Sequence, residues 1–269
     1  MFELVLDTLS SMCALTKDTE ISMEGNPSST TSIETLKALR DIGINRYSLG
    51  IQSFQEHILT ELGRDHTPST ALKSLLDARA VWPGKVSMDL IMGHAGQTLD
   101  DWIKELRFTM DIVDDHLSLY HLTVEPGTAL HTDVKQGKTT LPDGDLSTDM
   151  YEATIQLTRE VGFEHYEVSN FARNKAYSMH NSGHWLGIDY LGTLLSWMMH
   201  RTWRPRSNEP SSYTSKISHI QRQGLLEYLN KDATASCIDA GLLQLSVASL
   251  SPTERGMAVA DELSVRLLP

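Results

Sequence analysis

Residues 85–93, KVSMDLIMG, decide the class of fold because apolar and polar side chains alternate along them. Val86, Met88 and Leu90 would point to one face of a strand, and Ser87 and Asp89 to the other. Two earlier stretches alternate in the same way, residues 21–27 (ISMEGNP) and residues 44–54 (INRYSLGIQSF). The pattern predicts three strands, each with one apolar face and one polar face.

Helical periodicity separates these strands and also precedes and follows them. The expected helices cover residues 1–15, 32–43, 57–64, 69–82, 98–110 and 145–162, and a further strand begins at residue 116. Thr98 with Asp101, and Thr31 with Glu34, have the spacing of helix N-terminal caps. Strand–helix units of roughly thirty residues are typical of right-handed βαβ repeats and a parallel sheet.

The polar faces distinguish between two parallel architectures. An open, doubly wound sheet has helices on both faces, so both faces of its strands are apolar. A β/α barrel has helices only outside, and its interior can be polar when it holds a ligand. We therefore expect an α/β fold that is a partial (β/α) TIM-like barrel, with the doubly wound sheet as the alternative.

Three polar residues lie nearest the expected carboxyl ends of the strands, where barrel enzymes place their sites: Glu24, Gln52 and Asp89. A single carboxylate at such a position often only caps the next helix. Three polar side chains in register on adjacent strands favour a ligand site, because burying them without a partner is costly.

Composition narrows the classes of function. Acidic residues outnumber basic ones, 35 against 23, and the formal net charge is −12. Nucleic-acid binding by phosphate neutralisation is therefore not expected. The two cysteines, Cys13 and Cys237, exclude a disulfide scaffold and any site that needs three thiolates from this chain. No run of residues reaches the ~20 apolar positions of a membrane-spanning helix.

Several motifs resemble radical S-adenosylmethionine (SAM) proteins of the oxygen-independent coproporphyrinogen III oxidase group. They are EGNP (24–27), RYSLGIQSF (46–54), LGRDH (62–66), DLIMGHAGQT (89–98) and SLYHLTVEPGT (118–128). YEVSNFAR (166–173) and HNSGHW (180–185) resemble the HemW-like branch, the haem chaperones. The likeness runs nearly continuously from about residue 21 to residue 192.

The resemblance implies roles for four residues at a SAM site. Glu24 corresponds to the family carboxylate that contacts SAM, and Gln52 and Asp89 correspond to polar contacts, with Asp89 accepting hydrogen bonds from the ribose hydroxyls. Arg64 corresponds to an arginine near the SAM carboxylate, a favourable pairing of charges. Without the resemblance, Arg64 would be interpreted as a surface residue.

HNSGHW corresponds to the HNxxYW signature associated with haem binding. The resemblance makes His180 the candidate axial ligand to haem iron, beside Asn181, and Trp185 a ring that packs on the porphyrin. His184 replaces the tyrosine of the signature and is an alternative ligand or a weakness of the site. On spacing alone the segment would be interpreted as a solvated, His-rich loop.

Radical SAM proteins hold a [4Fe–4S] cluster with a CxxxCxxC loop, and this sequence has neither that loop nor the GGGTP strand end that precedes the matched region. The family pattern therefore implies that the first βα units are absent and that the chain is N-terminally truncated. We expect an incomplete barrel over residues 1–192, an irregular linker or splice-altered segment over 193–222, and a remnant of the family's small, mostly helical C-terminal domain over 223–269.

The resemblance favours a haem chaperone of the HemW type that binds haem and SAM and has no cluster of its own. The alternatives are a coproporphyrinogen oxidase-like radical SAM enzyme of porphyrin biosynthesis and an inactive form that acts by association. The missing cluster ligands argue against catalysis. The expected partners are haem and haem-requiring recipient proteins, and peripheral contact with membrane proteins or a homo-oligomer is compatible with the resemblance. Eukaryotic members imply a mitochondrial location, with the cytoplasm as the alternative, since no basic residue of a transit peptide precedes Lys17.

Overall fold

The computed structural model describes residues 2–12, 15–29, 32–186, 231–241, 243–245 and 250–252. The chain divides into two compact units, Met1–Ser182 and Gly183–Pro269. Each unit is described by itself below.

The first unit contains a sheet in which four strands run parallel. The strands are β1 (Ser22–Gly25), β2 (Arg46–Gln52), β3 (Val86–Met92), β4 (His116–His121), β5 (Glu164–His165) and β6 (Asn170–Ala172), in the order β1-β2-β3-β4-β6-β5. β1 to β4 are parallel, whereas β6 is antiparallel to both β4 and β5. The α/β prediction is confirmed, but the sheet is mixed rather than purely parallel.

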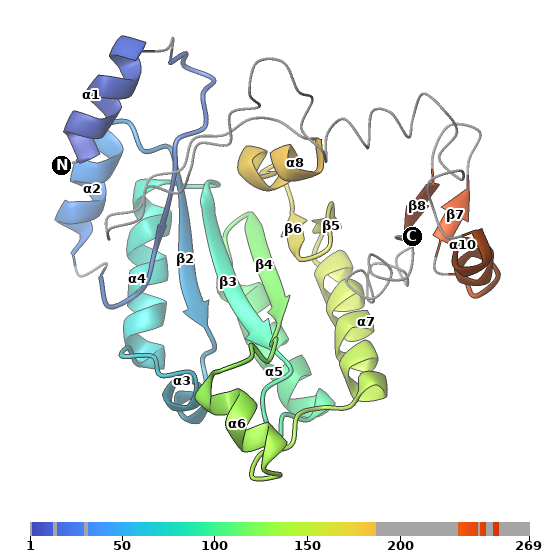
Figure 1. The fold of residues 1–269 in the computed structure, drawn as a ribbon. Helices are drawn as coiled ribbons and strands as arrows, with labels where there is room; N and C mark the ends of the chain where they lie inside the picture. The colour runs from blue at the N-terminus through green and yellow to red at the C-terminus, as the bar shows by residue number, and fades with distance from the viewer. Residues whose placement is uncertain are drawn as a thin grey trace. The chain divides into compact units, whose positions relative to one another are not determined.

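The helices follow the strands in the alternating order that the sequence predicts (Figure 1). They are α1 (Phe2–Met12), α2 (Ile33–Asp41), α3 (Glu56–Glu61), α4 (Pro68–Val81), α5 (Leu99–Ile112), α6 (Ala129–Lys135), α7 (Gly144–Glu160) and α8 (Met179–Leu186). The short α6 has no counterpart among the helices predicted from the sequence.

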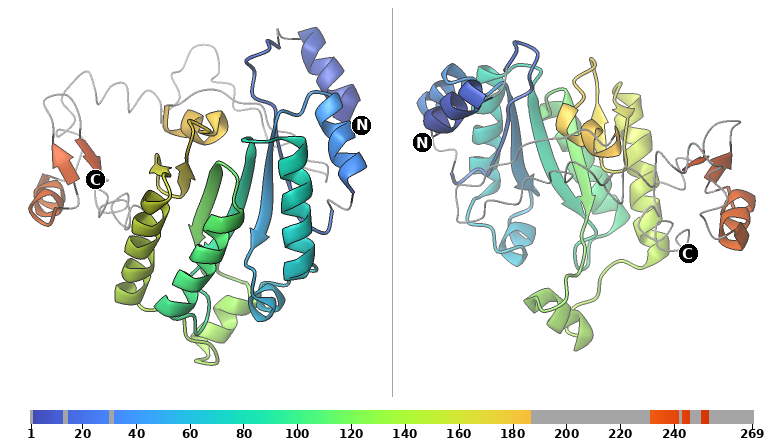
Figure 2. Two further views of the ribbon diagram at one scale, coloured as in Figure 1. Left: turned by 180° about the vertical axis from the view of Figure 1, so that it is seen from behind. Right: turned by 45° about the horizontal axis from the view of Figure 1, so that its top comes forward.

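One face of the sheet is apolar and covered by helices. Seen from behind, α4, α5 and α7 lie across β2, β3 and β4, whereas in Figure 1 no helix lies in front of those strands (Figures 1 and 2). Leu49, Met88 and Leu117 are fully buried on the covered face. Burying each such side chain stabilises the folded state by roughly 1.5–3 kcal/mol. Among the residues that the structure describes, the helices that cover β2, β3 and β4 lie on one face, which distinguishes this partial barrel from the doubly wound alternative.

The helix caps agree in part with the sequence. Thr98 caps α5, where its side chain accepts a hydrogen bond from the backbone N–H of Asp101, as predicted. The cap of α2 is Ser32, whose side chain accepts from Thr35, and not Thr31 with Glu34. The prediction was wrong by one position because Ser32 is also a good cap and lies closer to the first apolar position, Ile33.

The second unit includes α10 (Lys231–Asp239) and a hairpin of β7 (Leu243–Leu245) and β8 (Leu250–Pro252). The predicted boundary at residue 192 and the predicted linker, 193–222, lie outside the described residues. Within the described ranges, no helix has both the length and the apolar character needed to cross a membrane.

A buried carboxylate fixes the loop after β2 against α5. Glu105 accepts from Ser53 Oγ at 2.6 Å, from the Phe54 N–H at 2.7 Å and from Gln55 Nε2 at 2.9 Å. Glu105 is 6% exposed, so the two carboxylate oxygens, and not water, are the hydrogen-bond acceptors for these three donors.

We expect Glu105→Gln to lower the free energy of unfolding by ~2 kcal/mol, because an amide N–H₂ would face a donor that has lost its acceptor. Urea unfolding followed by circular dichroism measures the change. The matched control is Glu160→Gln at the exposed end of α7, with an expected change below ~0.5 kcal/mol. Equal midpoints for the two variants would contradict the assigned role of Glu105.

Candidate functional site: the polar face of the sheet

The register of the strands brings polar residues together on the face opposite α4, α5 and α7. Glu24 lies beside Ser48, Gly50 lies beside Asp89, and Asp89 lies beside Ser118. Residues paired in register point to the same face of a sheet. Glu24 and Asp89 therefore share one face, with Ser48 between their strands.

Asp89 is the centre of this face. Ser48 Oγ lies 3.0 and 2.9 Å from its two carboxylate oxygens, and the hydroxyls of Ser118 and Ser87 also hydrogen-bond to it. Burial raises the pKa of Asp89 from 3.8 to about 6, and the negative charge of Glu24 adds to the rise. The hydrogen bonds act in the opposite direction but do not offset the burial.

Gln52 reaches the same face through an irregularity at the end of β2. The register shifts between Gly50 and Gln52, and Gln52 has a φ of 74°. Its Nε2 lies 2.7 Å from the point that a Cβ on Gly50 would occupy, so the amide lies over Gly50. A side chain at position 50 would displace this amide, which explains the glycine.

Arg64 lies at the same end of the sheet but outside the cluster. Its side chain is exposed and makes no hydrogen bond or ion pair with Glu24, Gln52 or Asp89. The neighbouring Asp65 accepts from Ser28 Oγ at 2.5 Å, which holds this loop beside the segment after β1. Contact of Arg64 with a ligand stays a prediction.

The HNSGHW segment forms helix α8 and not the loop that spacing alone suggests. His180 and His184 are one turn apart on it. Trp185 and Leu186 are 62% and 71% exposed. The backbone N–H of His180 donates to Glu20 Oε1 at 3.1 Å.

The start of α8 lies at the amino edge of the sheet, away from Gln52. Glu20 precedes β1 and lies 3.8 Å from Arg46, the first residue of β2. Gln52 is the last residue of β2, ~20 Å further along the strand. The structure therefore brings Glu24, Gln52 and Asp89 together but places His180 and Asn181 at the opposite end.

Sequence reasoning missed a buried hydrogen-bonded group between these two ends. His116 Nδ1 lies 2.6 Å from Ser87 Oγ, and its Nε2 lies 2.7 Å from Tyr166 Oη. Ser118 Oγ donates to Asn170 Oδ1 at 2.7 Å. Alternation on β4 could have signalled His116 and Ser118, because both take the polar parity of the strand.

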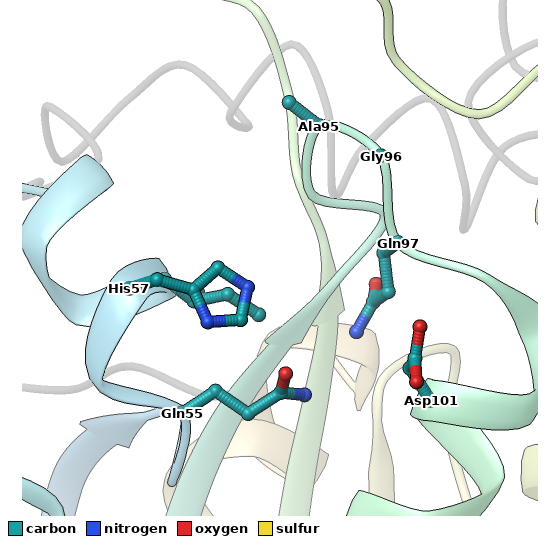
Figure 3. Close-up of a pocket in the computed structure, with 7 residues that line it drawn as sticks. Gln55, His57, Ala95, Gly96, Gln97 and Asp101 are labelled. Carbon is teal, nitrogen blue, oxygen red and sulfur yellow. The ribbon is translucent and has the colours of Figure 1, made fainter.

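A small pocket lies at the carboxyl end of β2 and β3, between α3 and the start of α5. Its volume is about 170 Å³, and Gln55, His57, Gln97 and Asp101 are among the residues that line it (Figure 3). Gln97 Oε1 accepts from the N–H of Gly93, while its Nε2 faces the pocket (Figure 3). The pocket can take a small hydrogen-bonding group or water.

The residues of this chain do not fit a [4Fe–4S] cluster. The sequence has two cysteines, of which Cys237 is buried in α10 and Cys13 lies outside the described residues. Three thiolates are needed. Among the residues with described positions, no group of three or more His, Cys, Asp or Glu side chains is arranged to hold a metal ion.

Comparison with known proteins agrees with this fold. The model of the radical SAM superfamily matches residues 3–109. The structure of coproporphyrinogen III oxidase (HemN) from Escherichia coli superposes with a TM-score of 0.69 at 17% identity, covering 98% of this chain and 73% of that one. At that identity the likeness concerns the fold alone. The chain belongs to the radical SAM superfamily.

Curated relatives assign the chain to a narrower family within this superfamily. Radical S-adenosyl methionine domain-containing protein 1, mitochondrial, of Mus musculus is 37% identical over 243 residues, which are 90% of this chain and 54% of the relative. Heme chaperone HemW of Escherichia coli (strain K12) is 34% identical over 188 residues, 70% and 48% of the two chains. The chain is a HemW-like member of the superfamily and spans about half the length of these curated relatives.

The raised pKa of Asp89 predicts a pH-dependent stability. The folded chain holds this proton more tightly than the unfolded chain, so stability falls as pH rises from about 4 to about 6. We expect Asp89→Asn to raise the free energy of unfolding by ~1–3 kcal/mol at pH 7.5, with the gain disappearing below about pH 4.

Urea unfolding of both proteins across this pH range measures the difference. Asp41→Asn, at an exposed carboxylate of α2, is the control and is expected to change stability by less than ~0.5 kcal/mol. A wild-type protein more stable than Asp89→Asn at pH 7.5 would show that the carboxylate is not destabilising.

Proposed function

We propose that this chain is the haem-binding and SAM-binding part of a haem chaperone of the HemW type, with haem on α8 and SAM on the polar face around Asp89. Support comes from the relatives, several of which are named haem chaperones. The observation that carries the haem assignment is α8 itself, a short helix that combines two histidines with exposed apolar side chains.

The chemistry of α8 suits a porphyrin. His180 provides an imidazole, the commonest protein ligand to haem iron, and Asn181 follows it at the half-buried start of the helix. Trp185 offers a flat exposed ring that can pack on the macrocycle. His184 lies four residues after His180, on the same face of the helix. We therefore propose His180 as the axial ligand and His184 as the alternative ligand.

The polar face suits the adenosyl part of SAM. Asp89 would accept hydrogen bonds from ribose hydroxyls, and Gln52 would supply an amide at the end of the strand. Glu24 is exposed on the edge strand β1 and would attract the positively charged amino group. With a [4Fe–4S] cluster, SAM supplies radical chemistry in this superfamily; the two cysteines here do not support a cluster, and no catalytic step is assigned to this chain.

Hemin titration followed by Soret absorbance tests the function. We expect saturable binding by the wild type and at least a tenfold weaker affinity for His180→Ala, because the axial ligand is lost. His131→Ala on α6 is the matched histidine control and should bind as the wild type does. Equal affinities for His180→Ala and His131→Ala would reject the haem site, and His184→Ala shows whether the second imidazole is the ligand.

Anaerobic iron–sulfur reconstitution tests the cofactor assignment. We expect no stoichiometric cluster and no absorbance shoulder near ~400 nm, because two cysteines cannot supply three ligands. The reconstituted protein should also form no protoporphyrinogen IX from coproporphyrinogen III and SAM. Stoichiometric iron and sulfide, or product formation, would support the oxidase-like alternative.

Two further aspects of the proposal follow from the relatives. Haem-requiring proteins are the proposed recipients. The mitochondrial location in the names of the vertebrate relatives makes the mitochondrion the proposed compartment, with the cytoplasm as the alternative. Haem binding by this chain alone would support the chaperone. Haem binding only in association with another protein would support the inactive form.

A further inference from the structure

Tyr166 connects the start of α8 to the interior of the sheet. Its hydroxyl accepts from the backbone N–H of Ser178 at 3.3 Å and hydrogen-bonds to the side chain of Asn181. Ser178 in turn begins the helix, since its Oγ accepts from the Asn181 N–H at 3.2 Å. Tyr166 is therefore hydrogen-bonded to Ser178, which precedes His180 in the chain, and to Asn181, which follows it.

His116 holds the hydroxyl of Tyr166 from the other side. The ring is 1% exposed, and burial together with the positive charge of Arg46 lowers the pKa of His116 to about 3. A neutral imidazole donates through one nitrogen and accepts through the other. His116 Nε2 lies 2.7 Å from Tyr166 Oη, so one nitrogen of this ring is hydrogen-bonded to the tyrosine hydroxyl.

The other ring nitrogen of His116, Nδ1, hydrogen-bonds to Ser87 Oγ at 2.6 Å. Ser87 hydrogen-bonds to Asp89 and lies 3.3 Å from Ser118 Oγ. The side chain of Tyr166 is thus fixed by a chain of hydrogen bonds that ends on the rigid centre of β3. Arg46 closes the other side, because its Nη2 donates to the carbonyl of Ala176 at 2.6 Å.

We propose that Tyr166, supported by His116, is a positioning residue for haem: it sets the direction of the first turn of α8 and so the direction in which His180 presents its imidazole. This inference rests on the proposed function. It assigns a role to the first tyrosine of YEVSNFAR, which acts through His180.

The test is a double-mutant cycle in hemin binding. Tyr166→Phe removes only the hydroxyl, and we expect about tenfold weaker binding, with a Soret maximum shifted toward that of His180→Ala. In Tyr166→Phe with His180→Ala, the affinity should equal that of His180→Ala alone, because Tyr166 acts through the missing ligand.

Tyr177→Phe is the matched control. The Tyr177 hydroxyl donates to Glu164, and its ring packs edge-on against Tyr166 at 5.2 Å, so it is an equally close tyrosine outside the chain of hydrogen bonds. Its hemin affinity and Soret maximum should match the wild type. If Tyr166→Phe does not fold, His116→Asn removes the hydrogen bond between Nε2 and the Tyr166 hydroxyl and is expected to shift both readings in the same direction.

The outcomes separate this inference from the proposed function. If His180→Ala loses affinity but Tyr166→Phe keeps the wild-type affinity and spectrum, the positioning role is wrong and the haem site stands. If the two losses multiply in the double variant, Tyr166 acts independently of His180 and the inference is also overturned. If His180→Ala binds as the wild type does, the haem site itself fails, and the positioning role fails with it.

Discussion

A carboxylate in the middle of a sheet costs free energy, and the polar face of this protein is organised around one. Asp89 lies on the central part of β3, where burial disfavours its charged form. Three serine hydroxyls, from Ser48, Ser87 and Ser118, recover part of that cost by hydrogen-bonding to it. A sequence selected for stability alone would have an apolar residue at this position.

The two proposed ligands use opposite ends of one sheet face. Glu24, Gln52 and Asp89 lie toward the carboxyl ends of the strands, whereas α8 begins at their amino edge. The helices on the far face contribute packing and no residue to either cluster. One helix-backed sheet therefore supports both groups, and the buried His116 with the half-buried Tyr166 occupies the space between them.

The sequence predicts much of this arrangement, because side chains alternate between the two faces of a strand. Once the apolar residues of β1 and β3 pack on the same face, Glu24 and Asp89 share the other face. Thr98 was predictable as a helix cap because Asp101 follows it at the spacing of an N-terminal cap. The antiparallel β6 was not predictable, because three residues, Asn170–Ala172, are too few to show alternation.

Contacts distant in sequence could not be inferred at all. His116 and Tyr166 meet although 50 residues separate them, and no local pattern pairs them. Arg64 shows the opposite case: its motif matches the family, but its side chain is exposed and no contact in the structure joins it to the other three residues.

Gly50 has a consequence for how genetic variation in this protein would be interpreted. The residue has no side chain and would normally be classed as a simple strand position. Because the Gln52 amide occupies the space where its Cβ would be, even an alanine at position 50 would require that amide to move. A missense change at this glycine would thus act on the proposed contact of Gln52 with SAM, two residues away.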